Sequence, residues 1–307
     1  MATADLHDTV GALQIGSLFS IFLYGILTLQ AHMYYQKFKD DRWQLRMLVA
    51  LAWLLELGHT FCVSAEIYKA TITYYGRPDK LFPFPFLGAS TAVGGGIAFL
   101  AHSFFSVRVF RVLPRPWNCV GAVTFLIALV RFIGSIVLAA RAVSAPGLEE
   151  YRRSVGWMAV SLLSMGAAID IMIATSMLFY LYGQREKVLA RSVRLIDRLV
   201  QYTLCTGLLP SLSAVVMVIM YSVDPDSMIW LAIYTCLAKL YSNSVLASLN
   251  ARATLRSTFN DSSSAAPFGR PTRANDPSQL VVAVEMKSAV THDGQDQMSK
   301  SYDFEHA

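Results

Sequence analysis

Apolar residues along this chain fall into long runs that show neither the alternation of a half-buried strand nor the polar face of a surface helix. Residues 9–36, 81–107 and 199–223 hold no Asp, Glu, Lys or Arg, and four further runs hold only one or two each. A helix needs roughly 20 apolar residues to cross a bilayer, and each run is longer than that. The pattern predicts seven membrane-spanning helices. They are expected at residues 9–36, 47–70, 86–108, 117–141, 155–182, 197–221 and 227–251.

Backbone hydrogen bonding decides what these runs can form. Inside a bilayer the backbone must satisfy itself, which leaves helices or a closed barrel. A barrel would show short alternating segments, and these runs are long and do not alternate. The fold class is therefore predicted to be all-α, a polytopic seven-transmembrane helix bundle.

The polar segments at both ends set the predicted domain limits. Residues 1–8 form a short leader outside the membrane, and residues 9–256 form the bundle. Beyond residue 256 the chain becomes rich in Ser, Pro, Asn and Asp, a composition that buries too little apolar surface to fold. Residues 257–307 are predicted to be a disordered tail.

Composition and charge agree with a membrane protein and add an orientation. Apolar types make up 54% of the chain and charged types 15%. Of the Lys and Arg residues in the connections, fourteen lie on the side that includes the C-terminus and five on the other. Connections rich in Lys and Arg stay in the cytosol. The N-terminus is therefore predicted outside and the C-terminus in the cytosol, and the net charge of +5 needs no nucleic-acid partner to explain it.

Several polar residues interrupt the predicted spans at similar depth, counted at 1.5 Å per residue. This candidate polar layer consists of Glu56, His59, His102, Arg131, Asp170, Lys239 and Asn243. An isolated charge at the bilayer centre costs about 3 kcal/mol, so two acids and two bases at one depth are expected to compensate one another. We expect Lys239 to face either Asp170 or Glu56, and Arg131 to face the other acid.

Motifs of several known chemistries are missing. A retinal pigment on Lys239 would need a carboxylate counter-ion, usually on the third span, and that span holds no acid. The motif positions of rhodopsin-like receptors read SVRVF and YSNSVLASLN instead of the acid–Arg–aromatic and Asn-Pro-x-x-Tyr motifs. Nucleophile elbows, phosphate-binding glycine loops and metal-binding His-Glu-x-x-His helices are not found either. The sequence predicts no enzymatic activity, no cofactor and no metal.

The polar layer supports more than one function. The first hypothesis is a receptor-like protein whose pocket is lined by Glu56, His59, Asp170, Lys239 and Asn243. The alternative is a small-solute or proton-linked transporter that uses the same charged layer. In a third, scaffolding, hypothesis the layer only fixes the packing of the helices.

Partners are expected both in the membrane and in the cytosol. The lipid bilayer surrounds the bundle, and a cytosolic partner could bind the basic segment at residues 183–198 or the tail. The sequence identifies no ligand. It is compatible with a location in the plasma membrane or in an endomembrane.

Three segments together carry a family resemblance. They are IDIMIATSMLFYL at residues 169–181, RLVQYTLCTGLLPSL at residues 198–212 and LAKLYSNSVLASLNAR at residues 237–252. They resemble the C-terminal signature of uncharacterised fungal membrane proteins that are abundant in mushroom-forming basidiomycetes and carry a domain of unknown function. The resemblance is strongest over residues 156–252. It implies a seven-helix integral membrane protein and supplies no activity.

Overall fold

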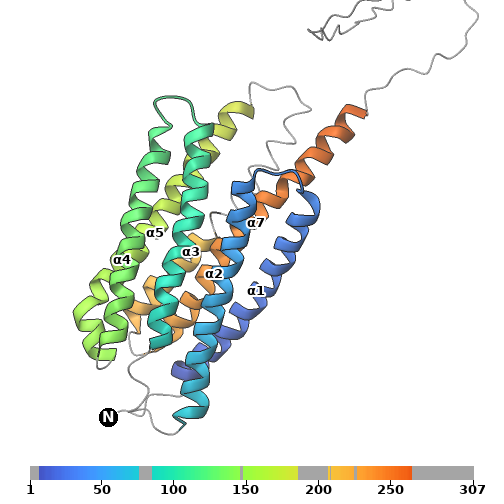
Figure 1. Cartoon of the computed structure of the whole chain (residues 1–307). Helices are drawn as coiled ribbons and strands as arrows, with labels where there is room; N and C mark the ends of the chain where they lie inside the picture. Colours follow the sequence, from blue (N-terminus) through green and yellow to red (C-terminus); the bar gives the residue numbers. More distant parts are fainter. Residues whose placement is uncertain are drawn as a thin grey trace, which may run out of the picture. The chain divides into compact units, whose positions relative to one another are not determined.

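The computed structural model describes residues 7–75, 85–145, 148–185, 207, 209–224 and 227–264. Every regular element in these residues is a helix (Figure 1). The long helices are α1 (Ala12–Lys37), α2 (Trp43–Tyr68), α3 (Pro85–Val112), α4 (Cys119–Ser144), α5 (Leu148–Arg185) and α7 (Ile229–Ser264). The π-helical turns η1 (His7–Gly11) and η2 (Lys69–Thr73) adjoin α1 and α2, and Leu209–Val223 forms a shorter apolar helix.

Five of the described helices are long and apolar enough to cross a membrane. They are Thr9–Lys37, Trp43–Thr73, Pro85–Val112, Cys119–Ser144 and Glu150–Gln184. Large hydrophobic side chains on these helices point outward: Phe22, Phe61 and Phe179 are 66, 67 and 79% exposed. Apolar surface on this scale is stable against lipid and not against water. The chain is a membrane-embedded helical protein.

The two remaining predicted spans differ from these five. Of residues 197–221 the structure describes residues 207 and 209–221, all of them helical. Helix α7 covers the last predicted span but falls outside the set of five. Its apolar sequence is interrupted by Lys239, Asn243 and several serines, which lowers its hydropathy.

Helix α7 packs along α1, and α3 packs against both α2 and α4 (Figure 1). Small residues bring these helices close together, as is common in membranes. A Cβ atom added at Gly16 of α1 would lie 2.7 Å from the Cα atom of Ala232 in α7. One added at Gly121 of α4 would lie 2.6 Å from the carbonyl oxygen of Ser106 in α3. Both contacts require glycine.

The carboxylate of Glu66, near the end of α2, caps the N-terminus of α3. Its Oε2 atom accepts hydrogen bonds from the backbone N–H groups of Phe86 and Leu87, each at 3.0 Å. Its Oε1 atom lies 3.3 Å from Nζ of Lys69. The first N–H groups of a helix have no partner within the helix, so a carboxylate placed there is stabilising.

Another ion pair ties α7 to the connection between α1 and α2. Arg252 donates to Oδ2 of Asp41 at 2.6 Å, and the hydroxyl of Tyr34 donates to the same oxygen at 2.8 Å. The guanidinium also lies over the ring of Phe38, 4.6 Å from its centroid. The hydrogen bond from Arg252 holds the pKa of Asp41 below its usual range.

Helix α7 also extends past the predicted end of the bundle. It continues to Ser264, so residues 257–264 are helical where the composition predicts a disordered tail. Extending a formed helix costs little per residue, and residues 252–264 contain no Pro or Gly to end it. The chain divides into two units at residue 265, and the second unit lies outside the described residues. The same holds for residues 186–198 of the predicted basic segment.

Candidate functional site

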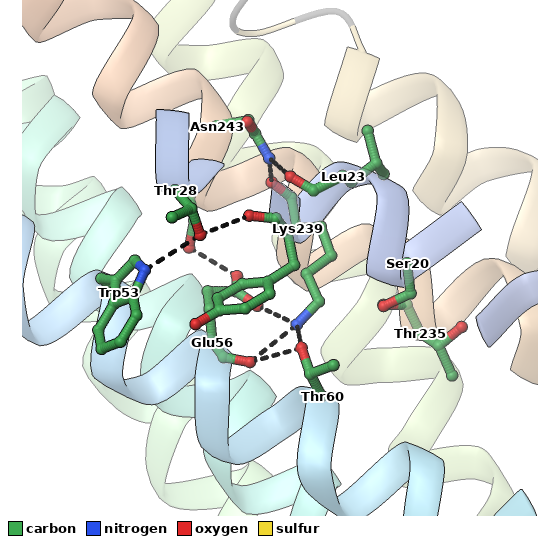
Figure 2. A network of polar contacts seen from close by, with 11 residues as sticks. Ser20, Leu23, Thr28, Trp53, Glu56, Thr60, Thr235, Lys239 and Asn243 are labelled. Atoms are coloured by element: carbon green, nitrogen blue, oxygen red, sulfur yellow. Dashed lines mark hydrogen bonds and ion pairs between the residues drawn. The ribbon is translucent and has the colours of Figure 1, made fainter. Parts of the chain in front are cut away.

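The ammonium group of Lys239, in the first third of α7, is fully enclosed against α2. The side chains of Lys239 and Glu56 are both 0% exposed. Nζ of Lys239 donates to Oε2 of Glu56 at 2.5 Å, to the backbone carbonyl of Glu56 at 3.0 Å and to the hydroxyl of Thr60 at 2.7 Å (Figure 2). An ammonium has three protons. Each of the three has a partner here.

Both oxygens of the Glu56 carboxylate also have hydrogen-bond partners. Its second oxygen, Oε1, accepts a hydrogen bond from the hydroxyl of Ser242 at 2.7 Å. Thr60 in turn donates to the backbone carbonyl of Glu56 at 2.7 Å. The ring of Tyr24 covers the ammonium, with its centroid 5.5 Å from Nζ of Lys239. We call Glu56, Thr60, Lys239 and Ser242 the ion-pair network. It leaves no free donor on the lysine for a ligand.

A further set of amide contacts joins α7 to α1. Nδ2 of Asn243 donates to the carbonyl of Leu23 at 3.1 Å and to that of Lys239 at 2.8 Å, and Nε2 of Gln30 donates to Oδ1 of Asn243 at 3.2 Å. Further along α7, Nδ2 of Asn250 donates to the carbonyl of Gln30 at 3.0 Å. Polar side chains that bond across helices in this way hold membrane helices together. Asn243 therefore acts as a link between α1 and α7.

The second acid has different partners from those expected. Oδ1 of Asp170 in α5 lies 3.1 Å from Nε2 of His102 in α3, and Oδ2 accepts a hydrogen bond from the hydroxyl of Tyr241 in α7 at 2.8 Å. Arg131 instead donates from Nε to the carbonyl of Leu162 at 2.9 Å. The partner predicted for Arg131 from the sequence is therefore wrong.

A glycine explains where Arg131 lies. A Cβ atom added at Gly166 would be 2.9 Å from Cζ of Arg131, so the guanidinium rests directly on α5 at this residue. Gly166 is four residues, about one helical turn, before Asp170. His102 and Tyr241 occupy both oxygens of the acid, and Arg131 is held one turn away from it.

The buried imidazole of His59 belongs to neither group. It is 0% exposed, and neither ring nitrogen has a hydrogen-bond partner among the described residues. The ring packs against Gly94 of α3, where an added Cβ atom would lie 3.5 Å from Nε2 of His59, an ordinary van der Waals distance.

A cavity of about 120 Å³ lies between α3, α4, α5, Leu209–Val223 and α7. We call it the bundle cavity. Among the residues of the candidate polar layer, it is lined only by Arg131. Asp170 lines a separate cavity of about 20 Å³, together with Tyr241. Glu56, His59, Lys239 and Asn243 line neither. Of the side chains predicted to line one pocket, Glu56 and Lys239 are paired with each other and Asn243 bonds to α1, and Asp170 alone among them lines either of these two cavities.

Tyrosines outside the candidate polar layer line the bundle cavity. They are Tyr151, Tyr221, Tyr234 and Tyr241, and Trp230 lies beside them. A signal for two of them exists in the sequence, since Tyr234 and Tyr241 are seven residues apart and so share a face of α7. That face is a different one from the face that carries Lys239 and Asn243.

These features define a membrane-embedded helical protein with a saturated ion-pair network and an adjoining cavity. Residues 166–254 match a protein family described as "Family of unknown function (DUF6534)". The chain thus contains a domain of unknown function that includes Asp170 and Lys239, whereas Glu56 and Arg131 precede it. A comparison with curated proteins finds no match.

Proposed function

We propose that this chain is a receptor-like seven-helix membrane protein that binds a small molecule in the bundle cavity. The seven helices are α1 to α5, the segment that contains Leu209–Val223, and α7. The N-terminus lies outside and the C-terminus in the cytosol, as the distribution of Lys and Arg indicates. The protein is not an enzyme in this proposal, and the ion-pair network has a structural role.

The position of the bundle cavity is the observation that carries the proposal. Its lining includes Leu87, Tyr151 and Trp230, which lie near the starts of α3, α5 and α7, and Tyr221, near the end of Leu209–Val223. In the proposed orientation all of these helix ends lie on the side of the membrane opposite the cytosol. The cavity therefore lies in the outer half of the bundle, where a ligand could enter from outside. Sites between helices of a bundle are common places for small ligands.

The contacts of the polar layer favour a receptor over a transporter. A solute or proton path through Glu56 and Lys239 would have to open a network in which both charged side chains are 0% exposed. Each proton of the ammonium already has an acceptor at 3.0 Å or less. Removing one partner from such a pair is strongly destabilising. The network is better suited to fixing α2 against α7 than to exchanging partners during transport.

Binding to the protein in lipid nanodiscs tests the proposal. Benzyl alcohol serves as a small probe, and Trp230, which lines the bundle cavity, serves as a fluorescent reporter. A saturable change is expected in the wild type and not in Trp230→Phe, which identifies the reporter. Ala159 lines the cavity and Ala140 is exposed on α4, so Ala159→Leu should abolish binding while Ala140→Leu should not.

Two results would count against the receptor proposal. Equal binding to wild type and Ala159→Leu would place the probe elsewhere, for example in the lipid. Solute flux into liposomes that is lost in Asp170→Asn would favour the transporter.

A further inference from the structure

Arg131 places guanidinium donors beside the bundle cavity that have no acceptor in the described part of the chain. Its Nε donates to the carbonyl of Leu162, and its Cζ lies 5.9 Å from the centroid of the Tyr241 ring. No described carboxylate lies within ion-pair distance of it: Glu56 pairs with Lys239, and Asp170 bonds His102 and Tyr241. The two terminal nitrogens, Nη1 and Nη2, are thus available to an acceptor inside the cavity.

Contacts with α5 fix the position of the Arg131 guanidinium. Gly166 lets it lie against α5, and a Cβ atom there would come within 3.0 Å of both Nε and Nη2. The bond from Nε to Leu162 orients the plane of the group. A guanidinium held in a fixed plane is preorganised for two parallel hydrogen bonds to a carboxylate.

The rest of the bundle cavity is mainly apolar. Leu162, Leu163, Met217 and Leu231 contribute to its wall. The hydroxyl of Tyr234 already has an acceptor, the carbonyl of Thr91 at 3.5 Å. A wall of this kind favours an apolar body, while Arg131 favours an anionic head.

The volume limits the size of the ligand. The cavity measures about 120 Å³, and an apolar protein cavity of about 150 Å³ accepts benzene. The two volumes are of the same order, which limits the ligand to about the size of one ring or a short alkyl chain and excludes a long lipid chain.

We infer that the bundle cavity binds a small organic acid with a single ring or a short chain, its carboxylate paired with Nη1 and Nη2 of Arg131. The inference rests on the proposed function and adds the class of ligand. The acid brings the negative charge that Arg131 lacks among the described residues. The apolar wall excludes water from the pair, which strengthens it.

Benzoate and benzyl alcohol, titrated in parallel into the protein in nanodiscs, test the inference. The two probes have the same ring and differ in the anionic head. Wild type should bind benzoate more tightly than benzyl alcohol. Arg131→Gln should weaken benzoate binding about tenfold or more, since a hydrogen bond to a charged group is lost, and should weaken benzyl alcohol binding by a much smaller factor. Arg141→Gln, an exposed arginine of the same helix that does not line the cavity, is the matched control and should change neither.

Each other result is decisive as well. If Arg131→Gln also loses benzyl alcohol, its cavity has collapsed and Arg131→Lys decides. A lysine keeps the positive charge but lacks the two parallel N–H donors of a guanidinium. Arg131→Lys should therefore bind benzoate more weakly than the wild type does, and should still bind benzoate more tightly than it binds benzyl alcohol. Equal affinity of that variant for both probes would overturn the inference. Wild type that binds benzyl alcohol and not benzoate would overturn it and leave the proposed function standing. Wild type that binds neither would overturn both.

Discussion

Removing the ammonium of Lys239 should expose how much the ion-pair network contributes to stability. In Lys239→Met, the carboxylate of Glu56 keeps its hydrogen bond from Ser242 and loses its ion-pair partner, while the Glu56 side chain is 0% exposed. An unpaired buried charge of this kind costs about 3–5 kcal/mol. In Glu56→Gln, the ammonium keeps Thr60 and the Glu56 backbone carbonyl and loses its counter-charge, with a cost of the same order.

The double variant Glu56→Gln/Lys239→Met should recover most of the lost stability. It carries no charge at either position, and the introduced amide oxygen can still accept from Ser242. Because the double variant should then cost less than either single variant, the coupling energy obtained from the four free energies of unfolding should exceed about 3 kcal/mol. Unfolding by SDS in mixed detergent–lipid micelles, followed by tryptophan fluorescence, gives these values.

A second cycle provides the control. Lys239→Met combined with Asp170→Asn removes two charges that do not bond each other, since Asp170 bonds His102 and Tyr241. The effects of this pair should be close to additive. Additive effects in the Glu56 cycle, or a large coupling in the Asp170 cycle, would refute the pairing described here.

Three further predictions concern packing, pH and orientation. Gly16→Ala should lower stability by about 1–3 kcal/mol through overpacking between α1 and α7, whereas Gly25→Ala on the same helix, with nothing within 4 Å, should not; SDS unfolding distinguishes them. Asp41 has a lowered pKa in the folded state, so its bond from Arg252 stabilises fully above the unfolded value of about 4 and is lost as pH falls through the lower folded value. Melting temperatures of wild type and Asp41→Asn should therefore differ at pH 7 and converge in acid, and a difference that persists in acid would contradict this. Asn260 begins the sequon Asn-Asp-Ser and is cytosolic in the proposed orientation, so glycosidase treatment should leave the protein mass unchanged, and a loss of mass traced to this site would invert the topology.

Much of the helical structure could be predicted because membrane helices are specified by composition over long windows. The charge-free runs at residues 9–36 and 81–107 became α1 and α3 with nearly the expected limits. The C-terminal end of α7 was harder to predict from composition. Residues 257–264 are polar, but they contain no helix-breaking Pro or Gly and continue the helix.

The partners of the buried charges could not be predicted in the same way. The depth of a charge in the membrane follows from counting residues along its helix. Its neighbours depend in addition on how each helix is rotated about its own axis, which the count does not give. Lys239 and Tyr241 are two residues apart on α7 and so point in different directions, one to Glu56 and the other to Asp170. Which neighbour each one meets depends on close contacts such as those at Gly16 and Gly166, and a single sequence does not show these contacts.

The most direct measurement is benzyl alcohol binding to two variants side by side in nanodiscs. One is Ala159→Leu, which fills the bundle cavity. The other is Glu56→Gln/Lys239→Met, which removes the ion pair and leaves the cavity lining intact. If the cavity is the ligand site and the ion pair is structural, the first variant loses binding and the second keeps it. Binding that survives in Ala159→Leu and disappears with the ion pair would contradict both assignments.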